Sequence, residues 1–423
     1  MSTPPDVVNL IWKLAHSRAP KKPFQHVLDL GAGDGRFAKA GKYVNYTGVE
    51  VDRAKLKGWE PRPGVRMVVG DALAWEGGDY DLCIGNPPYI RHHHLDREWQ
   101  NAVIERIQQQ CGVSVKQTAN AFLLFMMRGL LSTGPRGLLV MLVPFEWVTR
   151  PSAKEVREFI LSNGWETSVY RFSEDIFPRV LTTASVVIID KSKQCEPWRY
   201  GEIDKNGVIV EQKHASGTRT PVLPYKSGAA SLHALRGLSP GGQDIFVLTE
   251  TERVFFSLKK RIDVVPCVTS LREFPADRSM MDAKVFNKFF VEAGRRCWLI
   301  RSDRKKLSPE LTRYLVSVGD RWKQYTTCTV RGDKWYRYVA HPVPALLLSS
   351  GFVGRAPKVV NNHHGAIAVG SVYGIIADDF IPTEEIAAKL REYNFKDRVV
   401  GHANNLKKLE VKQLNAVLSN MLT

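Results

Sequence analysis

The chain contains 423 residues, of which 44% are hydrophobic and 24% are charged, and this composition is typical of a globular protein. Its 60 Lys and Arg residues exceed its 43 Asp and Glu residues, so the net charge of +17 favours a polyanionic partner such as nucleic acid. No apolar run is long enough to span a bilayer, and the N-terminus does not resemble a signal peptide. The six cysteines form no CxxC pair, which argues against a zinc site and a disulfide framework and predicts a cytoplasmic protein without a membrane partner.

The length predicts two domains, each large enough to bury a core. The first element expected is a helix that begins near Thr3, because Thr3 can cap it and proline is tolerated in a first helical turn. Val7, Val8, Ile11 and Leu14 then recur at helical spacing. This apolar stripe predicts a surface helix that packs one face against the first domain.

The next segment predicts a strand, a glycine turn and a helix. Residues 26–30 form a short apolar run, Gly31, Gly33 and Gly35 follow, and a helix is expected from Arg36. Glycines let a backbone approach a ligand closely, and a helix N-terminus supplies N–H donors. The spacing lacks the third glycine of the dinucleotide pattern GxGxxG, which disfavours a NAD-binding protein. A tight strand-to-helix turn without a ligand explains these glycines equally well.

Three further apolar runs lead into polar residues. Residues 46–52, 65–73 and 79–84 each predict a strand, and ligands bind at the carboxyl ends of the strands in open α/β sheets. Glu50 follows the glycine turn by about 20 residues, where a carboxylate contacts ribose hydroxyls in doubly wound folds. Asp71 can accept from the exocyclic amine of an adenine. The alternative for Glu50 is a solvated strand end.

The last of these strands runs into the loop Gly85-Asn86-Pro87-Pro88-Tyr89. Two consecutive prolines fix φ and force extended geometry on the residues before them, so the loop is expected to be stiff. It offers two acceptors, the side-chain oxygen of Asn86 and the carbonyl of Pro87, beside the ring of Tyr89. A planar base with an exocyclic amine suits this arrangement, because the amine can donate to the oxygens while the base stacks on the ring. Taken alone, the residues also fit an ordinary proline-rich turn.

Three consecutive histidines follow, His92, His93 and His94. Neighbouring residues of an extended chain point to opposite sides, which disfavours a shared metal ion and favours a loop near nucleic acid. Beyond them the sequence predicts a buried helix opening at Thr118, a helix at 154–161 and strands at 137–144, 169–172 and 182–189.

The predicted domains are residues 1–245 and 246–423. Residues 191–243 are polar and rich in Gly, Ser, Pro and Lys, which is typical of a domain end followed by a linker, and apolar periodicity resumes at about 246. The second domain interleaves cations with aromatic residues, which suits phosphates and bases, or else forms a solvated basic face. The cations and aromatics concerned are Arg295, Arg296, Trp298, Arg301, Arg304, Lys305, Lys306, Arg313, Arg321, Trp322, Lys323, Arg331, Lys334, Trp335, Tyr336, Arg337 and Tyr338.

In this order the residues resemble S-adenosylmethionine-dependent DNA adenine-N6 methyltransferases, and among these the TaqI-type enzymes of the γ order. In that order the cofactor motifs come first, NPPY comes next and the target-recognition domain comes last. The matching segments are TPPDVV, LDLGAGDGRF, GVEVD, VGDAL and GNPPY, all within residues 3–89. The resemblance implies an α/β fold with a doubly wound, mostly parallel Rossmann-like methyltransferase sheet and a C-terminal mixed α+β target-recognition domain.

The resemblance also implies the cofactor, the partner and the site. S-adenosylmethionine is the expected cofactor, no metal is required, and the partner is double-stranded DNA, from which the target adenine is flipped out. A monomer is expected, associated with the nucleoid through DNA and acting beside a separate cognate restriction endonuclease. The implied catalytic residues are Asn86, Pro87, Pro88, Tyr89 and Phe177, the last of which is equally well a core phenylalanine. The implied cofactor-binding residues are Thr3, Asp29, Gly31, Gly33, Glu50, Asp71 and Asn86.

Two other classes of function remain open. An N-methyltransferase acting on RNA adenine or on a protein glutamine would keep the same fold and cofactor, since NPPY also occurs there. A non-catalytic nucleic-acid-binding protein could retain a relic cofactor domain. The long basic C-terminal half favours duplex DNA over the first alternative, and the intact Glu50, Asp71 and Asn86 argue against the second. No PD-(D/E)xK nuclease pattern is found, so restriction activity is not expected in this chain.

Overall fold

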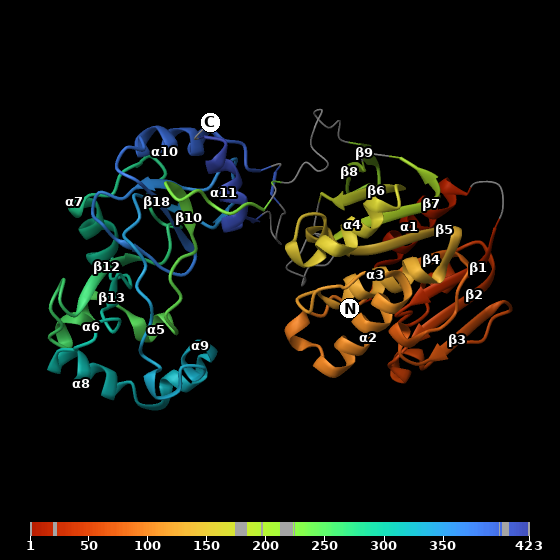
Figure 1. The fold of residues 1–423 in the computed structure, drawn as a ribbon, viewed down its shortest axis with the longest axis horizontal. Helices are drawn as coiled ribbons and strands as arrows, with labels where there is room; N and C mark the ends of the chain where they lie inside the picture. Colours follow the sequence, from red (N-terminus) through yellow and green to blue (C-terminus); the bar gives the residue numbers. More distant parts are fainter. Residues whose placement is uncertain are drawn as a thin grey trace. The chain divides into compact units, whose positions relative to one another are not determined.

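The computed structural model describes residues 2–19, 23–173, 184–195, 198–211, 223, 225–396, 398–399 and 406–421. The chain forms two compact units, which the described residues divide between 1–222 for the first and 223–399 with 405–423 for the second (Figure 1).

The second unit begins earlier than the predicted boundary at 245/246. β10 (Leu232–Leu235) pairs antiparallel with β18 (Val372–Ala377), so residues before 246 are part of a sheet of the second unit. The prediction fails here because a four-residue strand among glycine-rich and serine-rich segments carries too little periodicity to be recognised.

A nine-stranded sheet, counted over the described residues, is the centre of the first unit, with strand order β3-β2-β1-β4-β5-β7-β6-β8-β9. Neighbours are parallel except that β7 runs antiparallel to β5 and β6, and β9 runs antiparallel to β8. The predicted doubly wound, mostly parallel α/β sheet is therefore confirmed. Its strands are β1 (Phe24–Leu30), β2 (Tyr43–Glu50), β3 (Val65–Val69), β4 (Tyr80–Gly85), β5 (Thr133–Pro144), β6 (Trp165–Phe172), β7 (Ala184–Gln194), β8 (Arg199–Ile203) and β9 (Ile209–Glu211).

Helices cover both faces of this sheet (Figure 1). Because side chains alternate along a strand, Val27 of β1 packs in the apolar cluster that includes α1, whereas Leu28 packs in the cluster that includes α2, α3 and α4. α3 is apolar nearly all round, and its side chains are accordingly buried, as the sequence predicts. The helices of the unit are α1 (Pro5–Arg18), α2 (Arg97–Cys111), α3 (Ala121–Ser132) and α4 (Lys154–Ser162).

The helix expected from Arg36 is only a 3-10 turn at Phe37–Lys39. β2 already begins at Tyr43, which leaves no room for an α-helix between the glycine turn and the next strand. Further 3-10 turns of the first unit lie at Arg53–Leu56, Ala72–Ala74, His92–His94, Phe145–Val148 and Pro151–Ala153.

The described part of the second unit contains two four-stranded sheets and a two-stranded ribbon. Their strand orders are β10-β18-β14-β16, β11-β13-β12-β17 and β15-β19. The mixture of short strands and helices agrees with the predicted α+β class. The remaining strands are β11 (Val247–Leu248), β12 (Val264–Val268), β13 (Trp298–Ile300), β14 (Leu346–Ser349), β15 (Gly351–Phe352), β16 (Val359–Asn361), β17 (Ile367–Ala368) and β19 (Lys407–Lys408).

Short helices surround these sheets, and two apolar clusters form the core of the unit. Within one cluster the rings of Trp322 and Trp335 stack with centroids 5.6 Å apart. The helices are α5 (Gln243–Phe246), α6 (Glu250–Phe255), α7 (Ala283–Phe286), α8 (Pro309–Ser317), α9 (Thr326–Thr329), α10 (Thr383–Glu392) and α11 (Val411–Ser419), with a π-helical turn at Asn287–Val291 and 3-10 turns at Gly319–Gln324 and Gly332–Lys334. Among the helices that the structure describes, none has both the length and the apolar character needed to cross a bilayer.

Candidate active site

A pocket of about 780 Å³ opens at the carboxyl ends of the first strands of the nine-stranded sheet. Ligands bind at this edge in open α/β sheets, and the glycine turn, the ends of β2 and β3 and the loop after β4 all meet here. The segment before α1 and parts of α2 and α3 also line the pocket. The residues predicted for the site that line it are Thr3, Gly31, Gly33, Glu50, Asp71, Asn86, Pro87, Pro88 and Tyr89.

The glycine turn lies close against its neighbours. Gly31 and Gly33 have φ angles of 83° and 60°, which side-chain-bearing residues rarely adopt. A Cβ atom on Gly31 would lie 3.4 Å from the Phe125 ring and 3.6 Å from Pro88. The backbone of Gly31 donates to the Val49 carbonyl at 2.8 Å, so the turn is fastened to the end of β2.

Glu50 is the buried carboxylate at the end of β2, with 3% of its surface exposed. One of its oxygens accepts from the backbone N–H of Gly33 at 2.8 Å. The other accepts from the backbone N–H of Asp52 at 3.0 Å and pairs with the Lys55 ammonium at 3.2 Å. The carboxylate is thus fixed in position between the glycine turn and the pocket.

Asp71 stands at the end of β3 and has a partner that sequence reasoning missed. One carboxylate oxygen accepts from the Leu73 backbone N–H at 2.9 Å, and the other accepts from the indole N–H of Trp99 at 2.7 Å. Trp99 lies on α2, which is capped by Asp96, and it also lines the pocket. No sequence signal links Trp99 to Asp71, because nothing in the spacing predicts that α2 contacts the segment after β3.

The loop after β4 begins at a position that only glycine tolerates. Gly85 has a φ of 152°, and a Cβ atom there would lie 2.4 Å from the Asp29 carboxylate. The next side chain, Asn86, donates from its amide nitrogen to the Thr3 hydroxyl at 3.0 Å. Its amide oxygen is buried and has no hydrogen-bond partner among the described residues. An acceptor therefore lies free at the pocket wall.

Tyr89 is held at both ends of its side chain. Its ring meets the Phe122 ring edge to face, with centroids 6.3 Å apart, and its hydroxyl donates to the Leu142 carbonyl at 3.1 Å. Burial raises the pKa of this phenol well above its ordinary value, so it stays protonated and keeps donating. The ring is a fixed apolar surface that lines the pocket.

The expectation that Thr3 caps the first helix is wrong. The N-cap of α1 is Pro4, and no side chain caps the helix. The Thr3 hydroxyl instead accepts from Asn86, while the Thr3 carbonyl accepts from the guanidinium of Arg36. Arg36 is paired with Asp34 of the glycine turn, donating from Nε at 2.8 Å. Thr3 lines the pocket, and a chain of hydrogen bonds runs from the glycine turn through Thr3 to the Asn86 amide.

Asp29 lies behind the pocket and not on its wall. It is 1% exposed, and its carboxylate accepts from the Tyr46 hydroxyl at 2.5 Å while the other oxygen has no partner among the described residues. Burial, reinforced by the nearby Glu50 charge and opposed by the Tyr46 hydrogen bond, raises the pKa of Asp29 to about 7. This carboxyl is therefore partly protonated near neutral pH.

Two other predictions have different outcomes. Phe177 lies outside the described residues. His92, His93 and His94 form a 3-10 turn, in which the His93 ring lies edge to face with His92 at a centroid distance of 5.2 Å and tilted against His94 at 4.2 Å. Within the described ranges, no group of three or more His, Cys, Asp or Glu side chains is arranged to hold a metal ion.

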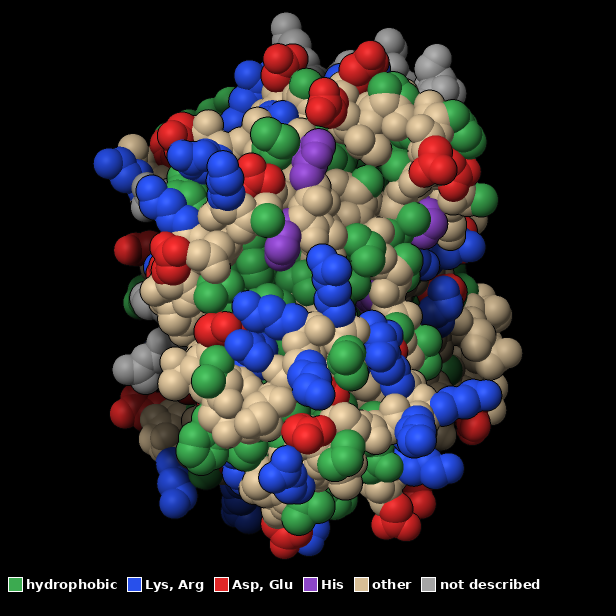
Figure 2. Space-filling view, turned by 90° about the vertical axis from the view of Figure 1, so that its left-hand side faces the viewer, with side chains coloured by type: hydrophobic (Ala, Val, Ile, Leu, Met, Phe, Trp, Pro, Cys, Tyr) green, Lys and Arg blue, Asp and Glu red, His purple; other side chains and the backbone are tan. Residues whose placement is uncertain are grey.

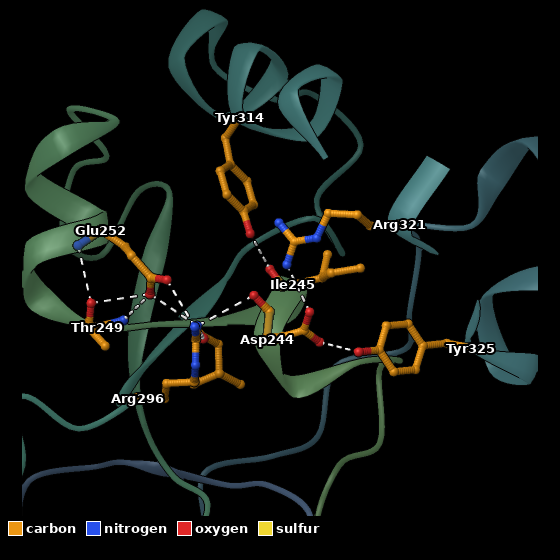
Figure 3. A network of polar contacts seen from close by, with 9 residues as sticks. Asp244, Ile245, Thr249, Glu252, Arg296, Tyr314, Arg321 and Tyr325 are labelled. Carbon is orange, nitrogen blue, oxygen red and sulfur yellow. Dashed lines mark hydrogen bonds and ion pairs between the residues drawn. The ribbon is translucent and has the colours of Figure 1, made fainter. Parts of the chain in front are cut away.

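The predicted basic stretch of the second unit contains arginines that are bound within the fold. Figure 3 shows two of them: Arg296 donates to both oxygens of Glu252 at 3.0 and 2.9 Å and to the Val247 carbonyl at 2.7 Å, and Arg321 donates to Asp244 at 2.8 Å. Tyr325 also donates to Asp244. These cations hold α5 and α6 to neighbouring segments and are not free charges.

Comparisons with known proteins find one family match and relatives among type II methyltransferases. Residues 47–177 match the family described as the Eco57I restriction-modification methylase. The chain is 18% identical to the type II methyltransferase M.AccI of Acinetobacter calcoaceticus, over 93% of this chain and 80% of that protein. It is 30% identical to the type II methyltransferase M.TthHB8I of Thermus thermophilus, over 53% of this chain and 49% of that protein.

A solved structure extends the likeness to both units. The type IIL restriction-modification enzyme MmeI, solved in complex with DNA, is similar over 96% of this chain and 64% of that one, with 12% identity and a TM-score of 0.60. At this identity the likeness shows the fold. Together the family match and the relatives support a DNA methyltransferase of a restriction-modification system, and they do not favour the RNA or protein alternative.

Proposed function

We propose that this chain transfers a methyl group from S-adenosylmethionine to the N6 amine of an adenine flipped out of duplex DNA, as the modification enzyme of a restriction-modification system. The observation that carries the proposal is the Asn86 amide oxygen, a buried acceptor without a partner among the described residues, at the wall of the pocket. Buried polar groups are nearly always hydrogen-bonded, so an exception in a pocket marks the place of a ligand donor. An exocyclic amine is such a donor.

The pocket has the groups that S-adenosylmethionine requires. Glu50 would accept from the ribose hydroxyls and Asp71 from the adenine amine, while the open space beside Gly33 leaves room for a close approach. Val51 lines the pocket with 70% of its surface exposed, which provides an apolar surface for the adenine ring. When bound, the cofactor supplies an electrophilic methyl group on a sulfonium.

The protein's part in the reaction is to bind and orient the target amine. The two amine hydrogens would be accepted by the Asn86 side-chain oxygen and the Pro87 carbonyl. These bonds favour a pyramidal nitrogen whose lone pair is no longer delocalised into the ring. Tyr89 would stack on the base, which must leave the duplex to reach the pocket. No covalent intermediate is needed, since positioning and electrostatics suffice for a direct displacement.

We further assign the TaqI-type γ arrangement, with residues from 223 onward as the target-recognition domain. The support is the order of the motifs and the completion of the pocket within the first unit. In this proposal the protein acts as a monomer, is found in the cytoplasm with DNA, and protects sites cut by a separate endonuclease.

The test is to express the protein in cells that lack adenine methylation and to sequence their DNA with detection of modified bases. We expect N6-methyladenine at one short sequence, and none in cells that express Asn86→Ala. Methylation of cytosine, or of RNA or protein while the DNA stays unmodified, would contradict the proposal.

A further inference from the structure

The basic stretch of the second unit contains two kinds of cation: some are hydrogen-bonded to acceptors within the fold, and others are exposed and have no carboxylate partner in the described part of the chain. Arg301 donates to the Asp303 carboxylate at 2.9 and 3.0 Å, and Arg337 donates to the carbonyls of Ser302 at 3.1 Å, Lys305 at 3.2 Å and also Arg304. Arg304, Lys305 and Lys306, in the loop that these bonds hold, are exposed. Among the described residues, no carboxylate forms an ion pair with any of these three cations.

Another basic loop, residues 259–261, lies earlier in the chain before β12 and was not part of the predicted stretch. It carries Lys259, Lys260 and Arg261, all of which are exposed. Lys260 pairs with Glu250 at 3.2 Å, whereas Lys259 and Arg261 have no carboxylate partner among the residues that the structure describes. Arg261 has a φ of 65°, a conformation that is unfavourable for a residue other than glycine. Glycine would adopt this φ without the strain that Arg261 carries.

The fold brings the two loops together. The Arg304 guanidinium donates to the Arg261 carbonyl at 3.1 Å, and the Arg301 backbone N–H donates to the Asp263 carbonyl at 2.7 Å. The acids near them are bound inside the fold: Asp263 is 1% exposed and accepts from the Lys259 backbone N–H at 2.8 Å, and Asp303 accepts from Arg301. The exposed charged side chains of the two loops are therefore cations.

We infer that loops 259–261 and 304–306 form one surface that binds the phosphate backbone of duplex DNA. The inference rests on the proposed function and adds to it a docking surface. Several Lys and Arg side chains gather on the face of the second unit drawn in Figure 2. Neither loop contains an aromatic residue, whereas proteins that bind single strands combine cations with aromatic rings on which bases stack. A duplex offers a continuous row of phosphates with its bases paired inside.

The two loops are also held in position before any ligand binds. The single Tyr338 O–H lies 2.7 Å from the Ile300 carbonyl and 3.2 Å from Asp303, and Arg337 binds carbonyls of the second loop and of Ser302 before it. In the first loop, the Arg261 backbone N–H donates to the Val264 carbonyl at 2.7 Å. Because these backbones are already ordered, binding does not have to order them, and phosphate contacts contribute more of their energy to affinity.

The test compares two triple variants of the full-length protein. The first replaces Lys259, Lys305 and Lys306 by Ala, since the ammonium groups of these lysines make no bond within the described fold. The second replaces Lys389, Lys396 and Lys412 by Ala, three exposed lysines elsewhere in the same unit, and changes the net charge equally. The measurement is the affinity for a non-specific DNA duplex as a function of salt concentration, with calorimetry of S-adenosylmethionine as a check of the site.

Affinity falls as salt rises, and removal of one phosphate-binding cation decreases the magnitude of the slope of log affinity against log salt by about 0.9. The magnitude should therefore decrease by roughly 2 to 3 in the first variant and by almost nothing in the second. Equal slopes for the first variant and the wild type, or an equal decrease in the control, would overturn the inference while leaving the proposed function intact. A decrease confined to RNA duplexes would also overturn it. A wild-type protein that binds S-adenosylmethionine but no DNA would contradict the proposed function itself.

The variant Arg261→Gly provides an independent measurement. Glycine adopts the positive φ without strain, so this change should stabilise the loop while it removes one charge. We expect the magnitude of the slope of log affinity against log salt to decrease by about 0.9, together with unchanged or higher thermal stability. An unchanged slope in this well-folded variant would contradict the role of the first loop.

Discussion

The two units of this protein carry their functional groups in different ways. In the first unit, polar side chains follow directly after strands, and the parallel sheet brings the strand ends to one pocket. In the second unit, cations are spread over loops and short helices, and their contacts decide which are bound within the fold and which are free (Figure 3). A site at strand ends follows from the order of motifs, whereas a charged surface depends on long-range packing. Predictions for the first unit are therefore sharper.

The largest effect is expected from Asn86 in the first unit. Asn86→Ala removes the free acceptor, whose bond to the amine matters mainly in the transition state, so turnover should fall by at least about a hundredfold. Cofactor and DNA affinity should change little, which calorimetry and a binding assay would check. If Asn86→Ala methylates DNA at the wild-type rate, the Asn86 oxygen is not the acceptor that the reaction uses, and the first unit does not carry its chemistry in the way proposed.

A second large effect concerns pH and the buried Asp29. Because its pKa is raised to about 7 from an unfolded value of 3.8, the protonated form stabilises the fold, fully below pH 3.8 and progressively less as pH rises to about 7. The decrease over this range is roughly 4 kcal/mol of unfolding free energy. Asp29→Asn should remove this pH dependence in denaturant titrations, while Glu105→Gln, a change at an exposed carboxylate of α2, should keep it. Parallel pH profiles for wild type and Asp29→Asn would contradict the assignment.

The cofactor site should respond to Glu50. Loss of hydrogen bonds to a charged group costs roughly 1.5–3 kcal/mol, so Glu50→Ala should weaken S-adenosylmethionine binding by about ten- to a hundredfold. Asp52→Asn is the matched control, since Asp52 is an exposed acid that follows the same strand. Unchanged affinity of Glu50→Ala in calorimetry would exclude Glu50 from ribose binding.

Tyr89 separates stacking from hydrogen bonding. Tyr89→Ala should lose base stacking worth roughly 1–3 kcal/mol in kcat/KM. Tyr89→Phe keeps the ring and loses only the bond to the Leu142 carbonyl, so it should remain active. Equal defects in the two variants would mean that the hydroxyl, and not the ring, is what the reaction uses.

The smallest effect is expected from Arg296, which tests the difference between bound and free cations in the second unit. Arg296→Met removes the bonds to Glu252 and Val247 and should lower the unfolding free energy by about 1 kcal/mol, since the pair is partly exposed to solvent. The salt dependence of DNA binding should not change, in contrast to the lysines of loops 259–261 and 304–306. A weaker salt dependence of DNA binding in Arg296→Met would show that bound arginines also contact phosphates.

For the first unit, much could be predicted from the sequence because the relevant structure is local. The apolar runs and the residues after them fix which side chains reach the sheet edge, and nine predicted site residues do line one pocket. The contacts that cross between elements could not be predicted. Trp99 binds Asp71, and Thr3 binds Asn86, because α2 and the segment before α1 pack over the pocket. No spacing rule relates residues on separate elements in this way.

For the second unit, composition identified a basic region but not which of its cations are free to bind a partner. Arg296 and Arg321 look equivalent to Lys305 in the sequence, and only their partners distinguish them. The domain boundary failed for a similar reason, since β10 is recognised only by its pairing with β18. A truncation at Gln243 would leave this strand without its partner, so a separate first unit should end near residue 222.

The unpartnered oxygen of Asn86 also has a thermodynamic consequence for the resting protein. A buried acceptor without a hydrogen bond costs about 1–3 kcal/mol, so the fold is less stable than it would be with an apolar side chain of similar shape. Asn86→Leu should therefore melt at a higher temperature than the wild type although it is inactive. Selection for heat resistance alone would remove the group on which the reaction depends, so activity here is maintained against stability.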